Sequence, residues 1–318
     1  MTTVREIVHE TRYEYAAPVS LAHHLAHLQP LDDAHQKVLS FDLDVEPAPA
    51  QRRDSRDSMG NAQRHFSLVL PHDRLRVRAS SRVRVQPRFA GLQPARSPAW
   101  DEVAESLRYV ARAPFRPEVE FAMPSPYVPR LEVLRDYARP SLPPGRPLAE
   151  AALELMHRIH ADYAYDSDST EIDTPLAQVV EHGRGVCQDF AHLMACALRM
   201  WGLPARYVSG YLLTRAPEGG AAMLGADASH AWVQVWCPGT PGVPAAGAGA
   251  GWLDLDPTND LVPGSGHVRL AVGRDYGDVT PLRGVIRGGG GAHTLGVAVR
   301  TRVLQPGPRV ASVYSQES

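Results

Sequence analysis

Two long stretches near the N-terminus alternate strictly between apolar and polar residues. The apolar positions of the first are Leu39, Phe41, Leu43 and Val45. Those of the second are Leu75, Val77, Ala79, Val83 and Val85, with Ser81 in step between them. A period of two puts every second side chain on one face of a strand, so each stretch predicts a strand with one buried and one solvated face. With turn signals at residues 59–61 and a further strand at 64–70, residues 1–86 are predicted to form an antiparallel β-sandwich domain.

The alternation stops at residue 87, and the next sixty or so residues are rich in proline. Prolines recur from Pro114 to Pro144 and break any long regular element there. Two short helical patterns remain, at residues 100–111 and 131–138. Residues 87–147 are therefore predicted to form a connector with short helices that lies against the domains it joins.

Helical spacing of apolar residues appears next. One stripe covers residues 148–163, and a second, apolar on nearly every side, runs from about Val186 to Trp201 and ends at Gly202. A helix that is apolar all round must be buried. We therefore expect the second helix to form the centre of a packed domain.

Strand-like runs follow the helices, at residues 205–213, 230–236 and 251–256. They predict that residues 148–285 form an α+β domain with an antiparallel sheet. After the glycine tract at 288–291 the remainder, 286–318, is interpreted as a Gly-rich linker and a C-terminal strand that can return to one of the sheets.

Composition narrows the classes of function. Hydrophobic residues make up 44% and charged residues 21% of the 318 residues, and the formal net charge is −2. This balance gives no general reason to expect nucleic-acid or membrane binding. The sequence shows no signal-peptide pattern and no uninterrupted apolar run of about 18 residues. We expect a cytoplasmic protein.

Arginines occupy the polar positions of the second alternating stretch, at Arg74, Arg76, Arg78, Arg82 and Arg84. Such a row could bind phosphate, but no aromatic platform or Gly-rich loop accompanies it. Lys37 is the only lysine in the chain, so arginine is the usual cation of this protein. We interpret the row as a solvated strand face.

The three cysteines, Cys187, Cys196 and Cys237, differ in their surroundings. Their odd number and wide spacing argue against a disulfide framework or a structural zinc site. Cys187 follows Gly183 and Gly185 on a tight turn at the start of the apolar helix. The free N–H groups and positive dipole of a helix N-terminus favour a thiolate and can hold an oxyanion. A buried cysteine can also be simply a small apolar residue, and Cys196, in mid-helix, fits that description.

Two neighbouring strands carry the partners such a thiol needs. The first begins with His230 and the second ends with Asp256, and a Gly/Ala/Pro loop at 239–251 joins them. If the strands pair antiparallel, His230 and Asp256 become direct cross-strand neighbours on one face, with Cβ atoms roughly 5 Å apart. A carboxylate at that distance can hold the imidazole in one tautomer. The residues therefore predict a nucleophile, a base and an orienting acid.

Two other polar clusters contain residue types that bind metals. His23, His24 and His27 lie close together in the β domain, but no acidic ligand stands at a telling spacing. The acidic residues Asp166, Asp168, Glu171 and Asp173 include no glycine where a calcium loop needs one. We interpret both as structural or solvated segments, and we expect neither a metal nor a cofactor.

These motifs together resemble the bacterial transglutaminase-like superfamily. The resemblance rests on residues 183–211, on Ser229-His230-Ala231-Trp232 and on Asp256-Pro257-Thr258-Asn259, and more weakly on residues 9–15, 18–19 and 71–72 of the N-terminal part. It implies a papain-like or transglutaminase-like α+β core in which Cys187, His230 and Asp256 form the catalytic triad. Gln188 and Trp232 are expected to line the oxyanion or substrate site.

The resemblance implies cysteine-dependent acyl transfer on a peptide or protein substrate through a thioester. Water as the acceptor gives a cysteine peptidase or amidase, and a primary amine gives a protein-glutamine transglutaminase. We favour hydrolysis, because selecting an amine over water demands a specialised tunnel. A non-catalytic interaction module remains the alternative of a different class, and the oligomeric state is open.

Overall fold

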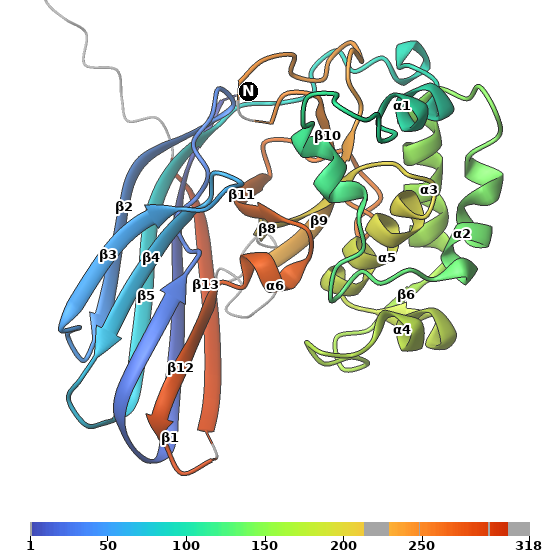
Figure 1. The fold of residues 1–318 in the computed structure, drawn as a ribbon. Coiled ribbons are helices and arrows are strands. Elements are labelled where there is room, and N and C mark those ends of the chain that lie inside the picture. The colour runs from blue at the N-terminus through green and yellow to red at the C-terminus, as the bar shows by residue number, and fades with distance from the viewer. Residues whose placement is uncertain (1, 213–228, 248, 292, 305–318) are drawn as a thin grey trace, which may run out of the picture.

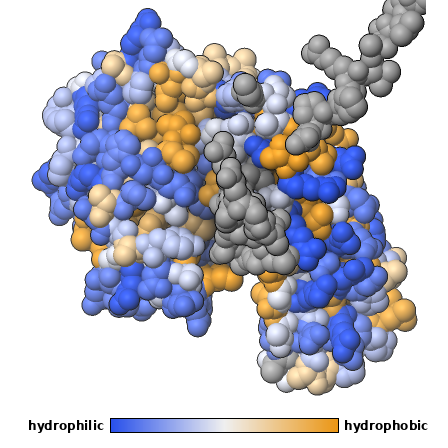
Figure 2. Space-filling view, turned by 180° about the vertical axis from the view of Figure 1, so that it is seen from behind, coloured by the Kyte–Doolittle hydropathy of each residue, from blue (hydrophilic) through white to orange (hydrophobic). Residues whose placement is uncertain are grey.

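The computed structural model describes residues 2–212, 229–247, 249–291 and 293–304, and it has two lobes (Figure 1). One lobe is built of long antiparallel strands, and the other combines helices with a small antiparallel sheet. The predicted α+β fold class is confirmed. Both lobes show a largely hydrophilic surface from behind (Figure 2). Among the described residues, no helix has the length and apolar character needed to cross a membrane.

The first lobe, called here the β lobe, is a seven-stranded antiparallel structure. Its strands are β1 (Thr3–Ala26), β2 (Gln36–Glu46), β3 (Gln51–Arg56), β4 (Ala62–Leu68), β5 (His72–Val85), β12 (Leu282–Gly288) and β13 (His293–Leu304).

The long strand β1 belongs to two layers of the β lobe. Its first half pairs with β5 and β13, and its second half pairs with β4 and β12. The register against β5 breaks between Glu14 and Val19, where the strand passes from one layer to the other. Val77 of β5 and Phe66 of β4 meet in the apolar core between the layers. The lobe is therefore a sandwich.

Strand β5 follows the predicted alternation. Its odd-numbered side chains from Leu75 to Val85 are buried, and its arginines point outward. These arginines pair with acids on neighbouring strands, as Arg76 does with Asp44 (2.9 Å) and Arg82 with Glu6 (3.3 Å). The interpretation of a solvated strand face agrees with this cross-strand pairing.

The chain returns to the β lobe at its C-terminal end. Strand β12 spans the expected boundary at residues 285 and 286, and β13 extends over twelve residues beside β1. Four consecutive glycines, 288–291, all have positive φ in the turn between the two strands. Residues 286–318 were predicted to be a linker and one strand. They contain the end of β12, the turn and the whole of β13, which together form most of a hairpin of the β lobe.

The connector contains two short helices and three 3₁₀ turns. They are α1 (Trp100–Ser106), α2 (Glu132–Ala138), η1 (Pro94–Arg96), η2 (Pro117–Ala122) and η3 (Arg139–Ser141). The first helix ends five residues before its predicted limit, and the second nearly matches its prediction. Trp100 and Leu134 are buried against the helices of the second lobe, so the connector covers that lobe's core.

The second lobe, called here the core lobe, packs helices on one face of a four-stranded sheet. Its elements are α3 (Leu148–Asp162), β6 (Ala164–Tyr165), α4 (Leu176–His182), β7 (Arg184–Gly185), α5 (Cys187–Arg199), β8 (Ala205–Leu212), β9 (Ser229–Trp236), β10 (Trp252–Leu255), β11 (His267–Gly273) and α6 (Tyr276–Val279). The sheet order is β10-β9-β8-β11, with antiparallel neighbours.

Helix α5 is the centre of the core lobe. Every residue from Asp189 to Arg199 is buried, as the apolar pattern predicted. Leu193 and Leu198 share an apolar cluster with Val233 of β9 and Leu253 of β10. This packing fixes the N-terminal end of the helix, with Cys187, relative to the sheet.

The β lobe is joined to the core lobe along strand β11. The Gln36 side chain bonds both the N–H (2.8 Å) and the C=O (2.7 Å) of Arg269, and the Asn61 side chain does the same for Val272 (2.8 and 2.7 Å). A side-chain amide offers the same donor and acceptor as a peptide group. Two amides of the β lobe therefore act as strand partners for β11.

Candidate active site

Cys187 is the first residue of α5, and the turn before it is shaped by glycines and by Asp189. Gly183 has a left-handed backbone (φ 64°). A side chain at Gly185 would meet the Asp189 carboxylate at 2.8 Å. That carboxylate accepts from the Val186 N–H (2.9 Å) and the Thr170 hydroxyl (2.7 Å). The Asp189 side chain thus caps the helix start and holds the residues on either side of Cys187.

The three cysteines lie in different environments. Cys187 is partly exposed, whereas Cys196 and Cys237 are buried. Burial raises the pKa of the Cys196 thiol to about 11 and also raises that of Cys237. Cys196 donates to the carbonyl of Pro129 (3.1 Å). Of the three, Cys187 alone combines exposure with a helix N-terminus.

His230 lies near the start of β9 and reaches both proposed partners. Its Nε2 is 2.8 Å from Oδ2 of Asp256, so Nε2 carries the proton of that bond and Nδ1 is left for the Cys187 sulfur. Burial by itself would lower the pKa of His230. The hydrogen bond to Asp256 and the contact with Cys187 outweigh burial and raise that pKa to about 10. The imidazole therefore carries a second proton at neutral pH.

The strand register differs from the prediction in one detail. Leu255 is opposite Val233, so Asp256 follows the end of β10 and lies diagonally, not directly, across from His230. Both side chains still project from one face, because the offset is an even number of residues. The imidazole and the carboxylate are long enough to meet across the diagonal. The predicted contact between His230 and Asp256 therefore forms, although the predicted register is wrong.

Asp256 is fully buried and accepts five hydrogen bonds. Oδ1 accepts from the backbone N–H groups of Thr258 (3.1 Å) and Asn259 (3.2 Å). Oδ2 accepts from His230, from Asn259 Nδ2 (2.8 Å) and from His267 Nε2 (3.0 Å). Burial alone would raise the pKa of Asp256, but the two imidazoles lower it below its usual range. The carboxylate is therefore ionised.

His267 is the residue that sequence reasoning missed. It lies at the start of β11, a strand that was not among the three strand-like runs, and its side chain is 5% exposed. The polar atoms of His230, Asp256 and His267 lie within 4.8 Å of one another. Two imidazole donors and one amide donor on a single carboxylate account for that convergence. The only signal in the sequence was the run from His267 to Gly273, whose alternation is weak.

Gln188 and Trp232 lie in unlike places. Gln188 is the second residue of α5 and donates to the carbonyl of Ile172 (3.0 Å) in the loop before α4. Trp232 has no exposed surface, and its ring meets the edge of His267 at 5.2 Å between centroids. The ring lies in the interior beside both histidines, at 6.1 Å between centroids from His230.

The two clusters weighed as metal sites are spread apart or solvated. His23 is exposed and bonds Ser67, His24 is stacked on Phe66, and His27 bonds the carbonyl of Thr280. The acidic residues 166–173 lie in a loop where Asp166 pairs with Arg184 (3.4 Å). Neither set converges on a common point in the part of the chain that the structure describes.

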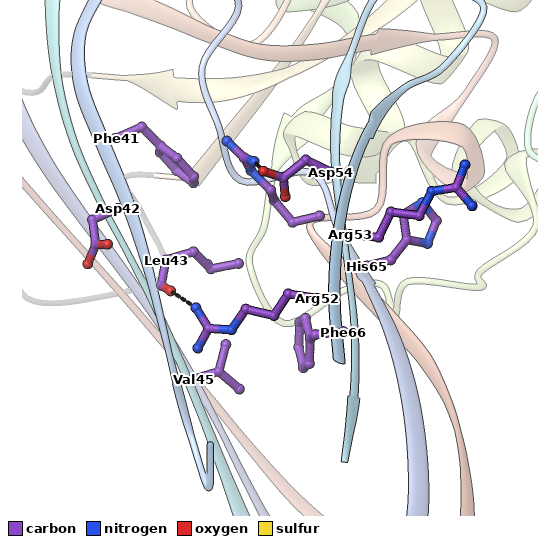
Figure 3. Close-up of a pocket in the computed structure, with 10 residues that line it drawn as sticks. Phe41, Asp42, Leu43, Val45, Arg52, Arg53, Asp54, His65 and Phe66 are labelled. Carbon is purple, nitrogen blue, oxygen red and sulfur yellow. Dashed lines mark hydrogen bonds and ion pairs between the residues drawn. The ribbon is translucent and has the colours of Figure 1, made fainter. Parts of the chain in front are cut away.

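A groove in the β lobe is a different feature from this site. Phe41 and Phe66 contribute apolar surface to it, and Arg52, Arg53 and Arg64 contribute charge (Figure 3). Arg52 donates to the carbonyl of Leu43 (3.2 Å), and Arg64 pairs with Asp54. These two guanidinium groups are engaged within the lobe, and the groove has no residue of the Cys187 cluster.

Two family models match the chain in succession. The model of the bacterial transglutaminase-like N-terminal region matches residues 6–84, and the model of the transglutaminase-like superfamily matches residues 135–257. The first range covers most of β1, all of β2 to β4 and nearly all of β5. The second contains Cys187, His230 and Asp256.

Relatives extend over most of the chain. An uncharacterized protein of Mycobacterium tuberculosis is 39% identical over 283 residues, covering 88% of this chain and 86% of that protein. An uncharacterized protein of Mycobacterium leprae is 31% identical over 300 residues, covering 92% and 96%. A protein-glutamine gamma-glutamyltransferase of Pseudomonas aeruginosa is 29% identical over 136 residues, which are 42% of this chain and 19% of that protein.

A solved structure shares the two-lobed fold. The crystal structure of a candidate cysteine protease from Cytophaga hutchinsonii matches with a TM-score of 0.68 at 19% identity, over 96% of this chain and 92% of that chain. At this identity the match shows the fold.

Proposed function

The chain belongs to the transglutaminase-like superfamily, and from this premise we propose that it is a cysteine-dependent acyl-transfer enzyme acting on peptide or amide substrates. The single observation that carries the proposal is the connected set Cys187–His230–Asp256 at the N-terminus of a buried helix. Nucleophile, base and orienting acid come from three elements and meet in one place.

In the proposed mechanism the Cys187 sulfur attacks the carbonyl carbon of an amide. His230 carries its second proton on Nδ1, while Asp256 holds the Nε2–H and so fixes the ring. The first-turn N–H groups of α5 have no partner within the helix and can hold the developing oxyanion, whose charge the helix dipole stabilises. His230 then gives its proton to the leaving amine, and a thioester on Cys187 remains.

The second half of the reaction decides the product. His230, now neutral, can take a proton from water, which attacks the thioester and releases an acid. A primary amine attacking in the same way would give a new amide instead. We propose hydrolysis, with transamidation as the second candidate. The similarity to a protein-glutamine gamma-glutamyltransferase over 136 residues supports transamidation as the second candidate.

The test compares Cys187→Ala with the matched variant Cys196→Ala on a library of peptides and glutamine donors. We expect Cys187→Ala to lose all turnover, because no other group supplies the nucleophile, and Cys196→Ala to retain it, because that thiol is buried. Mass spectrometry after thiol alkylation at pH 6 should find the label on Cys187 in preference to Cys196 and Cys237.

Three outcomes separate the candidates. Equal turnover of Cys187→Ala and wild type would refute the mechanism. Equal or absent labelling of the three cysteines, with no turnover, would favour a non-catalytic interaction module. Incorporation of a labelled amine into the product of the trapped thioester would make the enzyme a transglutaminase.

A further inference from the structure

Asp256 serves two imidazoles. Its Oδ2 accepts from Nε2 of His230 at 2.8 Å and from Nε2 of His267 at 3.0 Å, and all three side chains are nearly fully buried. A single hydrogen bond from His230 to the carboxylate would suffice to orient that ring. The second histidine therefore needs a separate physical account.

The position of His267 is fixed by both lobes. It begins strand β11, whose backbone is bonded by the side chains of Gln36 and Asn61 from the β lobe. Trp232 of β9 packs against its ring. With Nε2 donating to a buried carboxylate, the ring has little freedom to turn away.

We propose that His267 is a positioning residue of the reaction, which acts through Asp256 to limit how strongly that carboxylate holds the proton of His230. The inference rests on the proposed function. Because His267 is fixed through β11 by Gln36 and Asn61, it also gives the β lobe a part in the chemistry.

The physical reason is that one carboxylate charge is shared between two donors. The titratable groups that act on this centre are Cys187 on α5, His230 on β9 and His267 on β11, with the neutral Asn259 beside them. Asp256 still has four hydrogen bonds without His267, so it stays in place. Without His267, the Asp256 carboxylate interacts more strongly with His230, and the pKa of that imidazole rises further. An imidazole that holds its proton more tightly is a weaker acid toward the leaving amine.

This account predicts a split that general damage to the site would not produce. In His267→Leu, turnover of an amide substrate should fall by about 10- to 100-fold, the range expected for losing a hydrogen bond to a charged group. Alkylation of Cys187 by iodoacetamide at pH 6 should stay equal or become faster, because the thiolate–imidazolium pair is favoured. In His267→Gln, whose amide N–H can replace Nε2–H, both should remain within about threefold of wild type.

A substrate-independent readout is the proton NMR signal of the His230 Nε2–H, identified by its absence in His230→Ala. It should move downfield in His267→Leu and stay in place in His267→Gln. If His267→Leu does not fold, His267→Asn replaces it, because that amide is too short to reach Asp256. An unmoved signal in the Leu or Asn variant, or equal loss of alkylation and turnover, overturns the role of His267. The proposed function fails separately, if wild-type Cys187 is alkylated no faster than in His230→Ala.

Discussion

Two buried carboxylates in this protein have the same arrangement of partners and different chemistry. Asp256 lies between the imidazoles of His230 and His267. Asp33 lies between the guanidinium groups of Arg88 (2.8 Å) and Arg269, and all three of those side chains are at most 6% exposed. His267 and Arg269 are two residues apart on β11 and so project from the same face.

The difference lies in the bases. Burial alone would raise the pKa of Asp33, but Arg269 and Arg88 outweigh it and lower that pKa to about 2. An arginine keeps its proton at any physiological pH, so the charges around Asp33 are fixed and can only hold the two lobes together. A histidine can release its proton, so the same geometry at Asp256 permits proton transfer. The identity of the base decides between a structural and a chemical site.

The largest effect that would sharpen this comparison is expected from Asp256→Asn. Removing the charge that orients His230 should lower turnover by roughly 100- to 10,000-fold. The free energy of unfolding should change much less, because the asparagine side chain keeps an oxygen that can accept from the two imidazoles. Steady-state kinetics and urea unfolding measure the two quantities. Turnover equal to wild type would remove Asp256 from the mechanism.

The opposite result is expected from Asp33→Asn. Arg88 and Arg269, both buried, would lose the carboxylate that lies between them, so the free energy of unfolding should fall by about 3–5 kcal/mol. The matched control is Asp44→Asn on the exposed face of β2, where loss of the pair with Arg76 should cost less than about 1 kcal/mol. Urea unfolding measures both. Equal effects of the two substitutions would contradict the assignment of Asp33 as a fixed structural charge.

The smallest effect concerns a buried base with no acid. Both ring nitrogens of His24 are buried without a hydrogen-bond partner among the described residues, and burial lowers its pKa to about 4. The unfolded chain binds this proton near pH 6.5, so stability is lost as the pH falls from 6.5 toward 4.

Between pH 7.5 and 5.5 this histidine should contribute a loss of about 1 kcal/mol in the free energy of unfolding. In His24→Leu, the free energy of unfolding should fall by about 1 kcal/mol less between the same two pH values. Urea unfolding at the two pH values measures the difference. The buried His9 and His192, which also have lowered pKa values, contribute equally to both proteins. Identical pH dependence of wild type and variant would show that His24 is not held neutral by burial.

Local patterns were the reliable part of the sequence. The alternation of β5, the all-round apolar character of α5 and the apolar face of Val233, Val235, Leu253 and Leu255 each depend on which residues must leave water. The choice of which side chains are buried is visible in the pattern of consecutive residues. These patterns also indicated that Cys187 begins the helix and that His230 and Asp256 share a face.

Strand pairing between residues far apart in the chain was harder to predict from the sequence. The register between β9 and β10 differs by two residues from the prediction. The loop that joins the two strands sets this register, and its backbone path cannot be read from its sequence. The addition of β12 to β1 depends on a partner more than 250 residues distant. Trp232 has no exposed surface, because Leu31 and Met59 of the β lobe pack over it, and the strand pattern did not predict this cover.

The sequence by itself determined β5, α3, α5, β8 and β9 with their buried faces, and it indicated the three residues of the proposed triad, since each follows from neighbours along the chain; β11, which carries His267, was not among the predicted strands. Only the tertiary structure decided that a second histidine shares Asp256, and that Gln36 and Asn61 of the β lobe hold the strand that carries it. The physical reason is that a hydrogen bond requires two groups within about 3 Å, and for residues far apart in sequence that distance is set by the packing of the whole molecule.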